Sequence, residues 1–284
     1  MVTTMVLKDG RILCFAEYGD PAGRPVFFFH AAGSSRLHHP QEKILQQRGI
    51  RFIATDRPGH GRSDPQPDRT LLDWPDDVQQ LADHLNINRF FVAGWSSGGP
   101  YALACAHDLP TRVAGGAIIA GLAPPERPHP YRGLPFANQV LMFGARRCGP
   151  LVSLLRQLGY AMIRTDNKGE GSGIISTFPP VDRGLLQAPE DRKQFVQDIR
   201  EGYRQGWQGP AQDDLLINRP WGFRLADIPV RIDIWQGERD RNVPLRQAHY
   251  QHDKIPHSRL TLWSDLGHLG LLVRWQEVLA SLIE

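Results

Sequence analysis

The chain has 284 residues, of which 41% are hydrophobic and 22% charged, and these shares are ordinary for a globular protein. They exclude intrinsically disordered and fibrous classes. The formal net charge of +3 is small beside 33 basic and 30 acidic residues and is not gathered into a basic block, so we expect no nucleic-acid partner.

The three cysteines, Cys14, Cys105 and Cys148, are widely spaced and form no CxxC pair or Cys/His cluster. This spacing predicts no metal site, and an odd number of scattered thiols fits a reducing compartment. The first twenty residues lack the apolar run of a signal peptide, and no stretch reaches the roughly 18 apolar residues of a membrane span. We therefore expect a cytoplasmic protein without membrane insertion.

The first part of the chain alternates between short strands and helices. Asp9-Gly10 favours a hairpin turn, and the apolar run at residues 25–30 (PVFFFH) is typical of a strand buried on both faces of a parallel sheet. Strands are predicted at residues 4–7, 11–18, 25–30, 50–55, 89–93 and 113–120, and helices at residues 43–48, 72–85 and 100–107. This alternation predicts an α/β fold with a mostly parallel, twisted sheet flanked by helices.

The pattern changes at residues 121–125 (GLAPP). From there to about residue 226 the chain has many Pro and Gly residues and several helical stretches, but no clear strand. Strand patterns return at residues 228–235 and 259–263, followed by an amphipathic helix at residues 271–282. We therefore predict a core made of residues 1–122 and 226–284, with a mainly helical cap insertion at residues 123–225.

Residues 94–98 (GWSSG) match the pattern G-x-S-x-G, directly after an apolar strand and before an Ala-rich helix. A sharp strand-to-helix turn strains the backbone at its centre, and only glycine avoids clashes at the flanking positions. The Ser96 hydroxyl then stands at a helix N-terminus, whose partial positive charge stabilises a developing anion. We therefore predict that Ser96 is a nucleophile.

A hydroxyl nucleophile needs a base within hydrogen-bond reach at neutral pH. Among eleven histidines, His268 lies in the loop 265–270 (DLGHLG) between the last strand and the last helix. Such a loop lies at the carboxyl edge of the sheet, as does the turn that carries the nucleophile. We predict that His268 is the general base.

The base in turn needs a carboxylate that fixes its tautomer and stabilises its charged form. Asp240 follows the strand that ends at Trp235 and lies in a loop at the same edge, so we predict that it is this partner. Glu238 and Asp265 are alternatives, because one lies two residues before Asp240 and the other lies close to the histidine. Asp233 falls inside the strand and is less available.

The chain order Ser96, Asp240, His268, with G-x-S-x-G on a strand-to-helix elbow, resembles the α/β-hydrolase superfamily. Further agreement comes from residues 30–33 (HAAG), 56–63 (DRPGHGRS) and 237–240 (GERD). The resemblance covers nearly the whole chain, firmly at both ends and loosely in the insertion, which is a cap in that family. Similar haloalkane dehalogenases and epoxide hydrolases have Asp at the elbow, so the serine favours acyl transfer to water.

The resemblance also implies an oxyanion hole made by the backbone N–H groups of Ala32 and Ser97. In the family the segment after the first buried strand usually reads His-Gly-x-x-Gly, and here Ala31 replaces the first Gly. His30, at the end of that strand, is interpreted as a structural residue that holds the turn. We expect no cofactor.

Substrate choice is expected to lie between the sheet edge and the cap, since such an enclosed cleft is the usual binding pocket. Trp95, Phe136 and Phe143 are candidates for its lining. Ser96, Asp240 and His268 predict a serine hydrolase, and the apolar lining predicts that its substrate is a small, largely apolar ester. Arg146, Arg147 and Arg156 of the insertion fit an acidic substrate and a solvated helix face equally well.

Other reactions use the same three side chains. A lactonase, a C–C hydrolase, an amidase or an aminopeptidase remains open, and an aminopeptidase needs acidic residues in the cap to hold the substrate amine. The acidic residues of the insertion include Glu190, Asp191, Asp198, Glu201, Asp213 and Asp214. A ligand-binding receptor with a hydrolase fold is a further alternative from a different class. The expected partner is a small molecule, and the sequence carries no indication of an oligomeric state.

Overall fold

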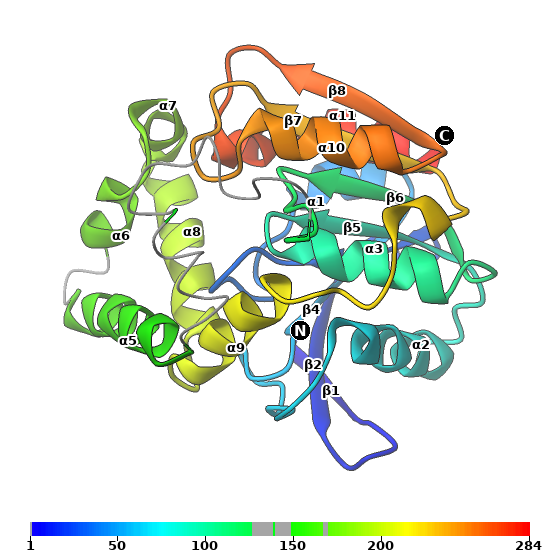
Figure 1. The fold of residues 1–284 in the computed structure, drawn as a ribbon, viewed down its shortest axis with the longest axis horizontal. Helices are drawn as coiled ribbons and strands as arrows, with labels where there is room; N and C mark the ends of the chain where they lie inside the picture. The colour runs from blue at the N-terminus through cyan, green and yellow to red at the C-terminus, as the bar shows by residue number, and fades with distance from the viewer. Residues whose placement is uncertain (1, 127–138, 140–148, 167–169) are drawn as a thin grey trace.

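The computed structural model describes residues 2–126, 139, 149–166 and 170–284. Within them, eight strands form one sheet in the order β1-β2-β4-β3-β5-β6-β7-β8 (Figure 1). Their bounds are Val2–Val6 (β1), Ile12–Gly19 (β2), Arg24–Phe29 (β3), Ile50–Thr55 (β4), Phe90–Trp95 (β5), Val113–Ile119 (β6), Ile232–Gly237 (β7) and Ser258–Trp263 (β8). β2 runs antiparallel to β1 and β4, and the other neighbours are parallel.

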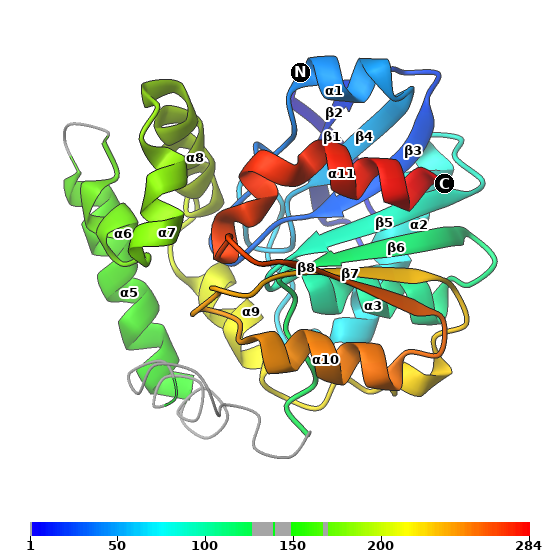
Figure 2. The same cartoon turned by 90° about the horizontal axis from the view of Figure 1, so that it is seen from above.

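Helices cover both faces of this sheet, with α1 and α11 on one face and α2, α3 and α10 on the other (Figure 2). Their bounds are Glu42–Gln47 (α1), Trp74–His84 (α2), Gly98–Asp108 (α3), Leu245–Lys254 (α10) and Leu271–Ile283 (α11). Phe27 and Phe29 of β3 join the core under α2 and α3, while Phe28 packs against Trp275 of α11. Because both faces are covered, β3 is apolar at consecutive positions rather than alternate ones.

The carboxyl ends of the central strands are aligned. Phe29 at the end of β3 pairs with Gly94 of β5, and Trp95 at the end of β5 pairs with Ile119 of β6. β7 and β8 continue this alignment on the far side of β6. The loops that follow these five strands therefore meet at one edge of the sheet, where α/β proteins bind their ligands.

The described residues between β6 and β7 contain helices and no strand. Their bounds are Gly149–Thr165 (α5), Ser172–Ser176 (α6), Pro180–Arg183 (α7), Pro189–Gly202 (α8) and Gln208–Ile217 (α9). In Figure 2, α5 to α8 form a layer beside the sheet, and α9 lies between that layer and the core. We refer to residues 123–225 as the insertion.

Asp213 of α9 ties the insertion to the core. Its buried carboxylate pairs with Arg57 at 2.7 Å and with Arg69, and it accepts a hydrogen bond from Tyr101 at 2.7 Å. Burial alone would raise the pKa of Asp213, but the charges of Arg57, His60 and Arg69 outweigh it and hold the pKa far below its usual range. Asp213 is therefore a structural anion rather than a free acidic group.

Two elements differ from the sequence-based prediction. The strand expected at residues 228–235 begins only at Ile232, because Pro229 has no N–H to donate to a ladder and a short 3-10 turn, Leu225–Asp227, precedes it. Helix α10 was not predicted. It begins directly after Pro244, whose fixed φ suits the residue that precedes a helix.

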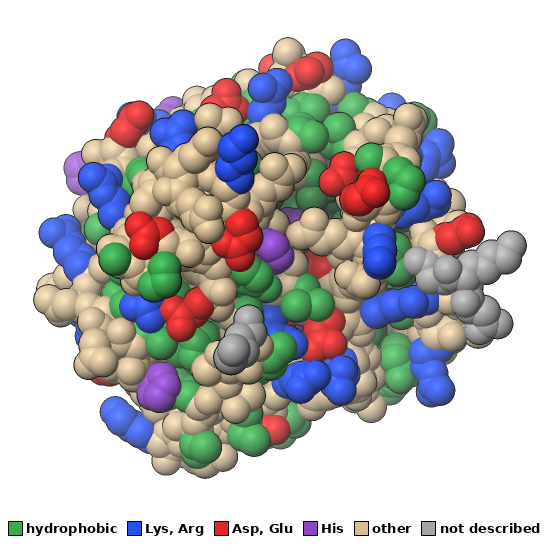
Figure 3. Space-filling view, turned by 180° about the vertical axis from the view of Figure 1, so that it is seen from behind, with side chains coloured by type: hydrophobic (Ala, Val, Ile, Leu, Met, Phe, Trp, Pro, Cys, Tyr) green, Lys and Arg blue, Asp and Glu red, His purple; other side chains and the backbone are tan. Residues whose placement is uncertain are grey.

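The surface mixes charges of both signs on the face shown in Figure 3, where blue and red side chains are interspersed. Among the residues described above, no helix is long and apolar enough to cross a membrane. The same part of the chain holds no group of three His, Cys, Asp or Glu side chains that could hold a metal ion.

Candidate active site

Ser96 lies at the tip of the turn between β5 and α3, with a φ of 55°. A left-handed backbone costs a non-glycine residue about 1–2 kcal/mol. The turn is also closely packed, since a Cβ on Gly94 would collide with the backbone oxygen of Gly98, and a Cβ on Gly98 with that of Phe29. Close approach of three backbone segments thus explains both glycines of the motif, and the strained turn holds Ser96 at the sheet edge.

Asp240 contacts His268. Its Oδ2 accepts a hydrogen bond from Nδ1 of His268 at 2.8 Å, and both side chains are buried. Its Oδ1 accepts the backbone N–H groups of Asn242 and Val243 at 2.7 and 2.8 Å, and Gln236 donates to Oδ2 at 3.0 Å. An ionised carboxylate only accepts hydrogen bonds, so Nδ1 carries the hydrogen and Nε2 of a neutral His268 is left as an acceptor.

The other carboxylates considered from the sequence do not contact His268. Glu238 and Asp265 are exposed. Asp233 is buried in β7, where it pairs with Arg259 at 2.9 Å. Asp240 is therefore the one of these four acids that meets the histidine.

The pKa of His268 is raised above its ordinary value. Burial by itself lowers this pKa, but the charge and hydrogen bond of Asp240, together with the charge of Asp182, outweigh it. The imidazolium form is therefore supported inside the protein. A group that accepts a proton during a reaction benefits from such support, because its charged form arises at the transition state.

The loop that follows β3 lies beside the elbow. In the part of the chain that the structure describes, the backbone N–H groups of Ala32 and Ser97 donate no hydrogen bond to a protein group. Arg57 holds this loop, donating to the backbone oxygens of His30 and Ala31, and reaches Oγ of Ser97 at 3.3 Å. The two N–H groups are thus not engaged within the described part of the chain.

Asp198 of α8 holds the same loop from the insertion. It accepts hydrogen bonds from Oγ of Ser34 at 2.5 Å and from the backbone N–H of Ser35 at 2.8 Å. His30 is fully buried, and its Nε2 accepts the backbone N–H of Arg57 at 3.3 Å. Burial and the nearby Arg57 keep the pKa of His30 well below its usual value, so it acts as a neutral, structural residue.

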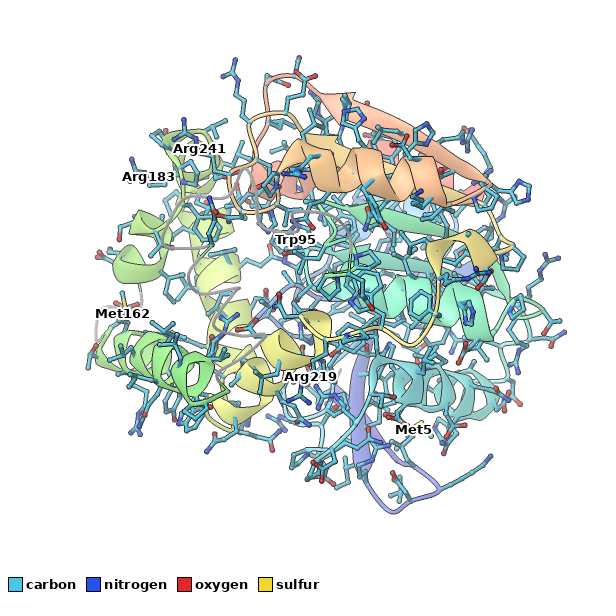
Figure 4. All side chains as sticks on the ribbon, in the orientation of Figure 1. Met5, Trp95, Met162, Arg183, Arg219 and Arg241 are labelled. Atoms are coloured by element: carbon cyan, nitrogen blue, oxygen red, sulfur yellow. The ribbon has the colours of Figure 1, made fainter. Side chains whose placement is uncertain are left out.

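Ser96, Ser97, Ala32 and His268 line one cavity of about 310 Å³. Trp95, labelled in Figure 4, also lines it, and its Nε1 donates to the backbone oxygen of His268 at 3.2 Å. Most of the remaining wall is apolar, with Leu122, Phe178, Phe195, Ile199 and Ile217. The other two residues expected to bind substrate, Phe136 and Phe143, lie outside the described residues.

One charge pair interrupts the apolar wall. Arg156 of α5 binds Asp214 of α9 through two hydrogen bonds, from Nε to Oδ2 at 2.5 Å and from Nη2 to Oδ1 at 2.7 Å. Its Nη1 donates to the hydroxyl of Tyr203 at 3.0 Å. Such a bidentate pair is geometrically fixed, so the two charges offset each other inside the cavity.

Sequence reasoning overlooked two site residues, Arg57 and Asp182, and did not predict that Arg156 and Asp214 bind each other. Arg57 lies in the turn at residues 56–63, which was noted for its likeness to the family but not for this side chain. Asp182 and the pairing of Arg156 with Asp214 carry no local signal. Each of these contacts joins segments that are far apart in the chain.

Residues 26–281 match the alpha/beta hydrolase family. The chain belongs to this family. The match covers most of the chain and confirms the fold expected from the sequence. It also identifies the protein as a hydrolase.

Two proteins are similar to this hydrolase along most of their length. A proline iminopeptidase from Xanthomonas citri is 29% identical, with 93% of this chain and 90% of the relative covered. A probable proline iminopeptidase from Leptolyngbya boryana is 32% identical, with 89% and 84% covered.

Solved structures share the fold at low identity. A hydrolase from Pseudomonas aeruginosa has a TM-score of 0.71 at 19% identity, with 99% of this chain and 98% of the other covered. An esterase from Exiguobacterium antarcticum has a TM-score of 0.70 at 19% identity, with 100% and 98% covered. An enol-lactonase from Burkholderia xenovorans has a TM-score of 0.66 at 19% identity, with 99% and 98% covered. Proteins named for different reactions thus share this fold.

Proposed function

We propose that this hydrolase is a serine esterase that cleaves small, largely apolar esters, with Ser96 as nucleophile, His268 as general base and Asp240 as its carboxylate partner. The observation that carries the proposal is the hydrogen bond of 2.8 Å between Asp240 and His268 beside a cavity that His268 and Ser96 both line. Asp240 fixes the tautomer in which Nε2 can accept the serine proton.

The proposed reaction has two steps. Ser96 Oγ attacks the ester carbonyl while its proton passes to Nε2 of His268, and the oxyanion accepts hydrogen bonds from the backbone N–H groups of Ala32 and Ser97. His268 then gives that proton to the leaving alcohol, and an acyl-enzyme remains. Water attacks the acyl carbon, loses a proton to His268, and releases the acid as the proton returns to Ser96. These steps use only side chains, backbone N–H groups and water.

The cavity supports a small, apolar substrate. Its volume of about 310 Å³ lies at the lower end of the range for ligand pockets. Phe178, Phe195 and Ile199 of the insertion offer apolar surface opposite the sheet edge. Burial of an apolar acyl chain contributes about 0.8 kcal/mol for each methylene, so binding should strengthen with chain length until the cavity is full.

The charges in the cavity favour an ester over a substrate with a free amine. All Asp and Glu residues of the chain lie among the described residues, since residues 127–138, 140–148 and 167–169 contain none. Of these acids, Asp214 is the one that lines the cavity, and Arg156 already binds both of its oxygens. An aminopeptidase needs an available carboxylate for the substrate amine.

An aminopeptidase remains the second candidate because of the two iminopeptidases described above. A lactonase would use the same three side chains and is distinguished by its substrate alone. Hydrolysis of prolyl-p-nitroanilide at a higher kcat/KM than that of any p-nitrophenyl ester would favour the aminopeptidase.

The direct test uses a fluorophosphonate probe, with intact mass and peptide mapping, on the wild-type protein and on Ser96→Ala. We expect one probe on Ser96 and none on the variant. Steady-state turnover of p-nitrophenyl acetate to octanoate should then show a maximum in kcat/KM at short or medium chain length. A folded wild-type protein that neither this probe nor a smaller one labels would refute the esterase. Labelling followed by a single slow turnover would favour a receptor.

A further inference from the structure

Asp182 of α7 lies against the loop that carries His268. Its side chain is fully buried, and its Oδ1 accepts the backbone N–H of Leu269 at 2.8 Å. A Cβ on Gly267 would lie only 2.5 Å from the same oxygen, so the carboxylate packs directly on the loop backbone. An acid from the insertion thus contacts the residues on both sides of the candidate base.

The buried position of Asp182 is energetically unfavourable for a carboxylate whose role is purely structural. Oδ2 of Asp182 has no hydrogen-bond partner among the described residues, and a buried charge costs several kcal/mol unless it is compensated. Burial accordingly raises the pKa of Asp182, against the backbone hydrogen bond of Leu269 and the charge of His268, which lower it. The backbone N–H groups of Leu269 and His268 offset part of this cost, and a protonated His268 offsets more of it through its positive charge.

The carboxylate also lies at the start of a helical segment. The 3-10 turn His268–Gly270 leads directly into α11, and Gly267 at its N-cap position has no side chain to satisfy the free N–H groups. Asp182 supplies the missing acceptor from another part of the chain. N-terminal caps of this kind stabilise a helix start by about 0.5–2 kcal/mol, so the acid helps to fix where His268 stands.

Two charged groups act on His268, Asp240 and Asp182. The other charged side chains on the elements packed around it are exposed, half-exposed or paired elsewhere. Arg183, labelled on α7 in Figure 4, is exposed and reaches the backbone oxygen of Ser176. The remaining charged residues on the loop after β7, the His268 loop and α11 are Glu238, Arg239, Arg241, Asp265, Arg274 and Glu277.

We propose that Asp182 is a positioning residue of the hydrolysis, which holds the backbone beside His268 and places a second negative charge near the imidazolium that forms when Ser96 loses its proton. The proposal rests on the function proposed above. It makes the insertion a contributor to the chemistry as well as to the pocket wall, because the acid comes from α7 and the base from the core.

The test compares Asp182→Asn, Asp182→Ala and the control Glu190→Gln, which removes one exposed charge from α8 of the same insertion. The readouts are kcat/KM for p-nitrophenyl acetate and the rate of fluorophosphonate labelling, each as a function of pH. In Asp182→Asn the amide oxygen still accepts the N–H of Leu269 but the charge is gone, so the acid limb of both profiles should move to lower pH. Asp182→Ala should also lose about 10- to 100-fold in kcat, because the base is no longer held in place. The control should match the wild type.

An acid limb that stays in place in a folded Asp182→Asn variant, judged by thermal unfolding, would overturn the proposal, because a purely structural acid changes stability and leaves the profile where it was. If Asp182→Asn does not fold, Asp182→Ser offers a smaller uncharged acceptor for the same measurement. If neither variant folds, the charge serves the fold and the proposal is rejected. Failure of the proposed esterase is distinguishable, since it would show as a wild-type protein that is not labelled at Ser96.

Discussion

The substitution Asp240→Asn tests the candidate site most directly, because the contacts of Asp240 determine how the new amide must lie. Oδ1 accepts two backbone N–H groups, from Asn242 and Val243, and only an oxygen can take that place. The amide nitrogen is then directed at His268 Nδ1 and at Gln236 Nε2. It donates to Nδ1, which forces the hydrogen of the imidazole onto Nε2, and it meets a second donor in Gln236.

A His268 with its hydrogen on Nε2 cannot accept the proton of Ser96. Loss of the productive tautomer in a Ser-His-Asp site costs about 10⁴ in kcat, which corresponds to about 5 kcal/mol of transition-state stabilisation. We expect a fall of that size in kcat for p-nitrophenyl acetate, measured at pH 8 with thermal unfolding followed in parallel.

The matched controls are Glu238→Gln and Asp265→Asn, which neutralise the two exposed acids nearest in sequence to the site. Both should keep kcat within about twofold of the wild type, since surface changes of this kind alter energies by only about 0.5 kcal/mol. A folded Asp240→Asn variant within tenfold of the wild type would refute the reasoning. A comparable loss of kcat in either control would indicate that the acid removed there, rather than Asp240, is the partner of His268.

Three further predictions concern stability, pH and selectivity. Asp213→Asn should lower the free energy of unfolding at pH 7 by about 3–5 kcal/mol in urea titrations. The difference between variant and wild type should shrink below about pH 4, where the unfolded wild-type chain protonates Asp213. An unchanged urea midpoint at pH 7 would contradict the anchoring role. The midpoint of the acid limb of the kcat/KM–pH profile should lie above the usual histidine pKa of about 6.5, because the raised pKa of His268 keeps the base protonated to higher pH. A midpoint below that value would contradict the role of His268 as a base with a raised pKa. Asp214→Asn leaves Arg156 without its counter-charge. The kcat/KM for a p-nitrophenyl ester with a terminal carboxylate should therefore rise about 10- to 100-fold relative to that for the uncharged ester of the same length. An unchanged ratio of these two kcat/KM values would show that Arg156 does not contact the substrate.

The three main residues of the candidate site could be predicted because each lies in the turn or loop that follows a strand. In a parallel sheet the carboxyl ends meet at one edge, so loops at Ser96, Asp240 and His268 converge whatever the distance between them in the chain. The elbow was predictable for a local reason, since Gly94 and Gly98 collide with nearby backbone if they carry a Cβ. The family match then confirmed the fold that this reasoning required.

The contribution of the insertion was not predictable in the same way. Arg57 and Asp213 are 156 residues apart, and Arg156 and Asp214 are 58 apart, with no periodic pattern that links them. From the sequence, the two acids were candidates for binding a substrate amine. In the fold each has an arginine partner, and only tertiary packing decides which acid is paired.

Asp182, Asp198 and Asp213 each bind a different loop of the core. Replacing the insertion with that of a related enzyme would therefore also disturb these core loops, because the insertion does not pack as an independent module. A chimaera whose foreign insertion lacked an acid at position 213 would leave Arg57 and Arg69 buried without a counter-charge, at a cost of about 3–5 kcal/mol. New substrate ranges are better sought by varying the apolar wall of the cavity while these anchoring acids are kept.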